Sequence, residues 1–164
     1  MILAPHVLVG AAIGAKIKNI GWIIVLAIMS HVILDKIPHW DYGDKENKRF
    51  KENKSYKTLF TFFAKLLIDG LIGLILVMLV IWYRKTMDLE HLIPILIGMF
   101  FAILPDILLG VFVISYVKSK KPSKNFIDFY HKTIHHSNHI RKPTLIGLGT
   151  EIAASIIAIL ILSI

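Results

Sequence analysis

The chain of 164 residues has 19 Lys and Arg residues against 11 Asp and Glu residues, for a formal net charge of +8. Its hydrophobic content is 55% and its mean hydropathy is +0.67; soluble domains are roughly 45 to 50% apolar, so an ordinary soluble globule is excluded. It contains no cysteine, which excludes disulfides, thiolate zinc sites and cysteine nucleophiles. Any metal must therefore bind through nitrogen and oxygen.

Five apolar segments are predicted, judged against the ~20 residues that a helix needs to cross about 30 Å of hydrocarbon. The first is short and contains Pro5 and His6, so it is either a true span or a half-inserted helix. We expect an all-α protein, a single integral membrane domain over residues 1–164, folded as a polytopic bundle of about five helices, or four spans if the first does not cross. In chain order the segments are Ile2–Ala15, Ile20–Ile37, Thr58–Tyr83, His91–Val117 and Thr144–Ile164.

The connections between these segments differ in length and charge. The short ones, Lys16–Asn19 and Arg84–Glu90, predict helical hairpins. The long ones, residues 38–57 and 118–143, hold most of the Lys and Arg residues. By the positive-inside rule the long loops are cytoplasmic, in a multi-pass protein of the cell (inner) membrane. The positive charge then reflects loops that face anionic lipid rather than nucleic acid.

Six ionisable side chains lie inside the apolar segments, where a charge costs roughly 2.5 to 3.5 kcal/mol on insertion scales. Counted along each helix at ~1.5 Å per residue, none of the six falls clearly in the half of the bilayer far from the long loops. The loops hold the other histidines except His91. We therefore predict one polar cavity that opens toward the cytoplasm. The six residues are His6, His31, Asp35, Asp69, Asp106 and Glu151.

The pattern around the second segment favours a metal site. His31 and Asp35 are four residues apart, so they share one helix face as two ligands, or as a ligand and the carboxylate that orients it. Pro38 ends or kinks the helix, which lets His39 turn back toward the same cavity. The alternative is a hydrogen-bonded His–Asp pair that joins helices.

A second histidine tract, FIDFYHKTIHHSNH, covers Phe126–His139. His131, His135 and His139 recur every four residues, and a helix would place them on one face with His136 beside them. We consider all four as metal ligands. A pH-sensitive cytoplasmic loop is the alternative.

The other intramembrane acids differ in their surroundings. Asp69 has Lys65 one turn earlier, so it is as readily an ion-pair partner as a metal ligand. Asp106 follows Pro105, whose loosened turn exposes backbone carbonyls to a polar cavity. Asp106 and Glu151 are candidate ligands and candidate catalytic groups, since either could act as the general base for a metal-bound water. Gly10 and Gly14 form a GxxxG motif, which indicates close helix packing.

Three features carry a family resemblance: His6 within APHVLVGAAIGA, the pair Pro105-Asp106, and His135-His136-Ser137. They resemble the YdjM-like inner-membrane metal-dependent hydrolases, which are distantly similar to the zinc-dependent phospholipase C and single-strand nuclease superfamily. The element formed by His31, Asp35, Pro38 and His39 looks like the HxxxD, Pro and His hallmark of that superfamily. The resemblance implies an all-helical fold that gathers histidines and aspartates around zinc and hydrolyses phosphodiesters.

The leading hypothesis is a hydrolase that uses one to three zinc ions, or manganese, to cleave a phosphoester of a membrane lipid or lipid-linked substrate at the cytoplasmic face. The rival is a transport or sensing protein, in which the same groups relay protons or bind a metal ion in passage. The third and least favoured is a cytoplasmic module on a membrane anchor that binds nucleic acid through the second long loop.

Overall fold

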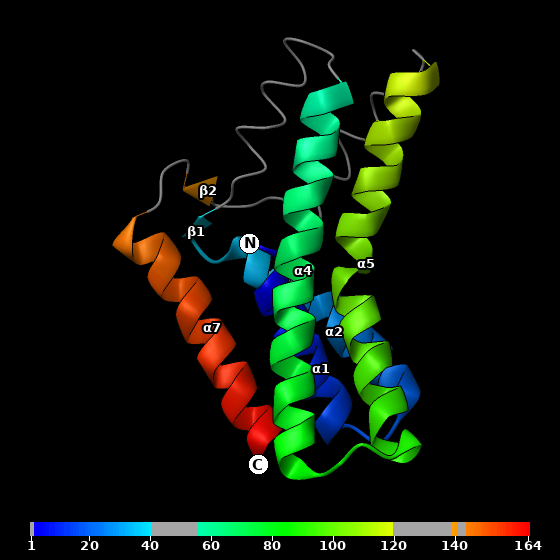
Figure 1. The fold of residues 1–164 in the computed structure, drawn as a ribbon, viewed down its shortest axis with the longest axis vertical. Coiled ribbons are helices and arrows are strands. Elements are labelled where there is room, and N and C mark those ends of the chain that lie inside the picture. The colour runs from blue at the N-terminus through cyan, green and yellow to red at the C-terminus, as the bar shows by residue number, and fades with distance from the viewer. Residues whose placement is uncertain (1, 41–55, 120–138, 141–143) are drawn as a thin grey trace.

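The computed structural model describes residues 2–40, 56–119, 139–140 and 144–164. Within these ranges the chain forms five helices and one pair of short strands (Figure 1). Each predicted apolar segment is a helix, so the all-α bundle is confirmed. The elements are α1 (Leu3–Lys16), α2 (Ile20–Lys36), β1 (His39–Trp40), α4 (Tyr56–Arg84), α5 (Leu89–Ser119), β2 (His139–Ile140) and α7 (Leu145–Ser163).

Three of the helices are long and apolar enough to cross a membrane, namely α4 over Phe60–Arg84, α5 over Leu89–Val111 and α7 over Leu145–Ser163. Large apolar side chains are exposed on their outer faces, for example Leu71 and Ile75 on α4. Apolar surface of this extent is costly in water and ordinary in lipid, where every helical backbone group is already hydrogen-bonded. The outer faces are therefore consistent with insertion in a membrane.

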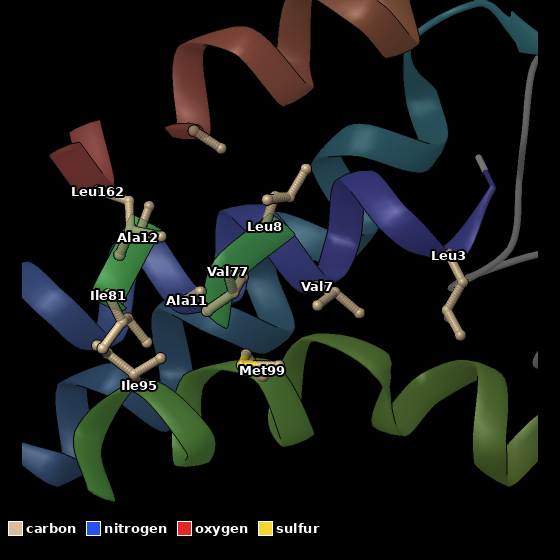
Figure 2. Packing of buried hydrophobic residues seen from close by; sticks show 11 residues of the cluster. Leu3, Val7, Leu8, Ala11, Ala12, Val77, Ile81, Ile95, Met99 and Leu162 are labelled. Atoms are coloured by element: carbon tan, nitrogen blue, oxygen red, sulfur yellow. The ribbon is translucent and has the colours of Figure 1, made fainter. Parts of the chain in front are cut away.

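Helix α1 lies at the centre of the bundle and packs against α2, α4, α5 and α7. It has 14 residues, about 21 Å at about 1.5 Å per residue, which is less than the hydrocarbon thickness of about 30 Å. It is buried on almost every side by the other helices. Figure 2 shows its side chains among those of α4, α5 and α7; the labelled residues include Val7, Leu8, Ala11, Ala12, Val77, Ile81, Ile95, Met99 and Leu162.

The contact between α1 and α5 is a contact between backbones. A Cβ atom on Gly98 would collide with the carbonyl oxygen of Gly10, and one on Gly14 would collide with the carbonyl oxygen of Pro94. Small residues allow this approach, and the close packing predicted from the GxxxG motif is confirmed. On another side of α1, Gly73 of α4 lies against Ala4 and Val7 in the same way.

The α4–α5 turn is fixed by its own hydrogen bonds and ties α7 to α4. Thr86 N–H donates to the Ile81 carbonyl (3.2 Å) and Lys85 N–H to the Trp82 carbonyl (3.1 Å), with Lys85 at φ 57°, which is the Schellman pattern of a helix end. The Arg84 guanidinium donates to the Leu162 carbonyl (2.9 Å) and to the Ile164 carbonyl (3.1 Å). This turn and the α1–α2 turn lie at the same end of the bundle (Figure 1).

The strands β1 and β2 form a parallel pair in which His39 lies opposite His139 and Trp40 opposite Ile140. The sequence predicted only loops over residues 38–57 and 118–143. The helix expected for the histidine tract does not include His139, which lies in a strand. A pairing of two residues across so long a sequence separation leaves no local periodicity to detect. Its effect is to join the chain that leaves α2 to the chain that enters α7.

We expect Gly98→Ala to lower stability, because the added methyl group collides with the α1 backbone and the two helices must separate. The expected loss is about 1–3 kcal/mol, the usual cost of overpacking, and thermal unfolding in detergent measures it. Gly149→Ala is the matched control, since a Cβ there meets nothing within 4 Å and alanine favours the helix by about 0.5–1 kcal/mol. Equal melting temperatures for the Gly98 variant and the parent would contradict the close contact.

Candidate metal centre

Four of the predicted side chains meet where α1, α2 and α5 come together. His6 Nε2 lies 3.3 Å from Asp35 Oδ1, and His31 Nε2 lies 3.4 Å from Asp35 Oδ2. His31 Nε2 is also 3.7 Å from Asp106 Oδ1. The two imidazole rings stack with centroids 4.2 Å apart and planes inclined by 28°. Asp35 therefore contacts both histidines, and the four groups form one cluster.

As predicted from their i,i+4 spacing, His31 and Asp35 lie on one face of α2. His6 reaches them from the first turns of α1. Asp106, which directly follows Pro105, reaches them from α5. His6, His31 and Asp35 are essentially inaccessible, whereas Asp106 keeps 15% of its side-chain surface. Asp106 is thus the most accessible member of the cluster.

A backbone carbonyl determines which nitrogen of His31 faces the cluster. His31 Nδ1 lies 2.7 Å from the carbonyl oxygen of Ala102 on α5. A carbonyl oxygen can only accept, so Nδ1 carries the proton and donates. In the neutral ring, Nε2 is then the lone-pair nitrogen, and it points at Asp35 and Asp106. Metal-binding histidines are usually oriented by such an Nδ1–H bond to a backbone carbonyl or a carboxylate.

The cluster fits a metal ion by distance. One ligand atom from each of His6, His31 and Asp106 lies within 4.8 Å of the others. Ligands held about 2.0–2.1 Å from a tetrahedral zinc ion are separated from one another by about 3.4 Å, and within this group His31 Nε2 lies 3.7 Å from Asp106 Oδ1. This distance, and the 3.3 and 3.4 Å from the two histidines to Asp35, are longer than the 2.7–3.2 Å typical of an N–H···O hydrogen bond. Direct hydrogen bonds between these groups would therefore be weak.

The cluster also fits a cation by its charge and by the state of His6. Two carboxylates in an apolar interior are costly to desolvate, and positive charge placed close to them lowers that cost. Both ring nitrogens of His6 are buried, and neither makes a hydrogen bond with the described residues. A divalent cation would balance Asp35 and Asp106 and would use a ring nitrogen of His6. The alternative left by the sequence is a protonated His–Asp pair that joins helices.

His39 and Glu151 lie near the strand pair at the start of α7. His39 is buried, and its Nδ1 lies 2.7 Å from the Ile37 carbonyl, so this nitrogen also carries the proton. Glu151 is buried on α7. The preceding residue, Thr150, donates its hydroxyl to the Pro38 carbonyl (2.7 Å), which fixes α7 against the chain just before β1. Among the described residues, the group with ligand atoms within 4.8 Å is His6, His31 and Asp106, so His39 and Glu151 flank the centre.

Asp69 of α4 has a structural role at the start of α1. Its Oδ2 accepts a hydrogen bond from the backbone N–H of Ala4 at 3.0 Å. The N-terminal N–H groups of a helix have no partner within the helix, and the residue before α1, Ile2, makes no side-chain cap. Asp69 therefore caps α1 from a neighbouring helix, where the negative charge also complements the helix dipole. This accounts for an acid inside α4 without a metal.

Of the four histidines in the second tract, His139 lies within the described residues. His131, His135 and His136 lie outside the described residues. The backbone of His139 is in β2, opposite His39. The structure thus places His139 beside His39 through a strand pair and not along a helix.

His91 lies apart from the cluster, as the sequence predicted. It is exposed at the start of α5, where its Nδ1 lies 2.7 Å from Asp88 Oδ1. Asp88 also accepts the backbone N–H of His91 at 3.1 Å and so caps α5. The hydrogen bond from the His91 side chain lowers the pKa of Asp88. His91 and Asp88 are therefore a natural control pair for His31 and Asp35.

The sequence did not predict that the Ala102 carbonyl binds His31, because an alanine side chain does not indicate a role for its backbone. Pro105 could have indicated it, since a proline in a helix disturbs the preceding turn and leaves carbonyl groups there available to other partners. Ala102 lies in that turn, and its oxygen orients His31.

No protein-family model matches this chain, and comparisons with curated proteins and with solved structures find no match either.

The cap formed by Asp69 can be distinguished from a metal ligand by two substitutions. Asp69→Leu removes the acceptor, and we expect it to cost about 0.5–2 kcal/mol in thermal stability, as for other caps. Asp69→Asn keeps an acceptor oxygen and should stay closer to the parent. Both variants should keep the parent's metal content per folded molecule, as measured by elemental analysis. Loss of metal from a well-folded Asp69→Asn protein would contradict the structural role.

Proposed function

We propose that this protein is a membrane-embedded, metal-dependent hydrolase that cleaves a phosphoester of a lipid or lipid-linked substrate. The observation that carries the proposal is the cluster of two stacked histidines and two aspartates contributed by α1, α2 and α5. The long loops next to this end of the bundle are taken as cytoplasmic, so the reaction is assigned to the cytoplasmic face. The YdjM-like resemblance points to the same class of reaction.

The proposed holders of the metal are His6, His31 and Asp106, whose ligand atoms lie within 4.8 Å of one another, together with Asp35, which contacts both histidines. His6, His31 and Asp35 are the least accessible members of the cluster, and the histidines are oriented by the ring stack, by the Ala102 carbonyl and by their contacts with Asp35. Rigid ligands of this kind set the position of the metal before substrate arrives. Zinc suits nitrogen and oxygen donors, and manganese is the alternative.

When bound, such a metal supplies an acidified water and a Lewis acid for the phosphoryl oxygens. Asp106 is the proposed general base, because it adjoins His31 and is the exposed carboxylate of the cluster. It would accept a proton from the attacking water. Glu151, buried on α7 beside the strand pair, is the second candidate for proton transfer or metal binding.

The lipid character of the substrate follows from where the cluster lies. It is surrounded by helices whose outer faces are apolar, and α4, α5 and α7 are consistent with membrane insertion. A phosphoester held in a lipid headgroup would approach the cluster from the membrane surface without leaving the bilayer. A soluble substrate gains nothing from this placement.

Metal content tests the proposed centre directly. We expect protein purified without chelator to hold at least one zinc or manganese ion per chain. His31→Ala and Asp35→Ala should each lose it, since removing one ligand typically removes most of the affinity of a site with few ligands. The controls His91→Ala and Asp88→Ala change the same residue types outside the cluster and should keep the metal. A parent protein that is stoichiometrically free of metal would refute the proposal.

Asp106→Asn tests the assigned base. It keeps the shape of the side chain and removes the proton acceptor, so we expect hydrolysis of a phospholipid or lipid-linked phosphoester to slow by about 10²–10⁴-fold. Release of the phosphorylated headgroup measures the rate. Metal uptake into proteoliposomes with no headgroup release from any phospholipid offered would instead support the transport alternative.

A further inference from the structure

An apolar groove lies between α2 and α7 on the face of α1 that neither helix covers. Its volume is about 270 Å³, and Val9, Ile13 and Lys16 of α1, Leu26 of α2, and Ile157 and Ala158 of α7 are among the residues that line it. Apart from Lys16, the lining side chains carry only carbon, and none of the described lining residues is acidic. Lys16 therefore lines the groove with its alkyl chain, and it is an exposed residue that carries a positive charge.

The groove is open because of how the helices are fastened. Helices α2 and α7 both pack on α1, while the principal contacts of α7 beyond α1 are with α4 and β1. Arg84 of α4 holds the C-terminal end of α7 through the carbonyls of Leu162 and Ile164. α7 is therefore anchored to α4 and leaves the side that faces α2 unfilled.

The size and chemistry of the groove select an alkyl chain. One turn of an α-helix with its side chains, about 10 Å across and about 5.4 Å long, already needs more volume than the groove offers. A single hydrocarbon chain fits, and the apolar walls offer it no polar competitor. In a membrane the molecules at hand with such chains are lipids.

Lys16 determines which lipid headgroup suits the groove. It is exposed in the last turn of α1, whereas His6 lies in the first turns of that helix. Lys16 is therefore at the end of the bundle where the two short turns connect the helices. An ammonium group at this level is placed to bind a phosphate and favours a headgroup with net negative charge. We propose that the groove binds one acyl chain of an anionic phospholipid whose phosphate is held by Lys16. This lipid belongs to the leaflet opposite the metal centre and is distinct from the substrate.

Photolabelling in liposomes tests the site without any reference to hydrolysis. The liposomes are phosphatidylcholine with a small amount of either phosphatidylglycerol or phosphatidylcholine that carries a diazirine in one acyl chain, and labelled positions are mapped by mass spectrometry. We expect the phosphatidylglycerol probe to label Val9, Ile13 and Ile157 more than Leu71 and Ile75, which lie on the outer face of α4.

Two variants separate the headgroup from the chain. Lys16→Gln should lower labelling by phosphatidylglycerol about fivefold, the value of one lysine at a membrane surface. It should lower labelling by phosphatidylcholine by a smaller factor, because choline already balances the charge of that phosphate. Ile161→Phe, at an exposed residue that lines the groove, should fill it and abolish labelling there by both probes. The matched controls are Lys18→Gln, in the same turn, and Ile156→Phe, an exposed residue of α7 outside the groove; both should resemble the parent.

Three results would overturn the proposal. The first is groove labelling no stronger than at Leu71 and Ile75. The second is labelling that survives Lys16→Gln but falls in His31→Ala, which would identify a chain that enters from the metal centre. The third is cross-linking of the groove to a second copy of the protein in place of lipid.

Discussion

The close approach of α1 and α5 is the constraint on which the rest of the structure depends. Gly10 and Gly98 let the two backbones touch, and a Cβ on Gly10 would also collide with Ala102. Ala102 is the residue whose carbonyl orients His31, and Gly10 lies one turn beyond His6. The contact therefore sets the distance between the helices that carry His6 and Asp106, and a wider separation would disperse the cluster.

The cluster in turn contributes to holding these helices together. It joins α1 to α2 through His6 and Asp35, and α2 to α5 through His31 and Asp106, with groups that would be costly to bury separately. A bound cation would add to the stability of the bundle, since it binds the folded arrangement and not the dispersed ligands. Loss of metal and loss of thermal stability should therefore occur together in variants of His31 and Asp35, whereas Gly98 variants lose the helix contact first.

The two ends of the bundle have different chemistry, and α1 connects them. At one end lie the His–Asp cluster, the strand pair and Glu151, and at the other lie Lys16, the Arg84 contacts and the open end of the groove. Helix α1 is shorter than the bilayer is thick, and this is tolerated because other helices surround it and it does not have to span the hydrocarbon by itself. Its two termini therefore contribute to the two ends of the bundle. The proposed reaction and the proposed bound phospholipid thus occupy opposite leaflets of one protein.

The sequence by itself determined the helices and half of the site. Apolar runs fixed five helices to within a few residues, and the i,i+4 spacing placed His31 and Asp35 on one face, because both signals are local. The tertiary structure alone decided that α1 is enclosed, that His6 and Asp106 are the ones among the other predicted residues that join that pair, that Asp69 caps α1, and that His139 pairs with His39 in a strand. These outcomes depend on which helix faces meet, and that is determined by packing between segments far apart in the chain, which no periodicity within one segment records.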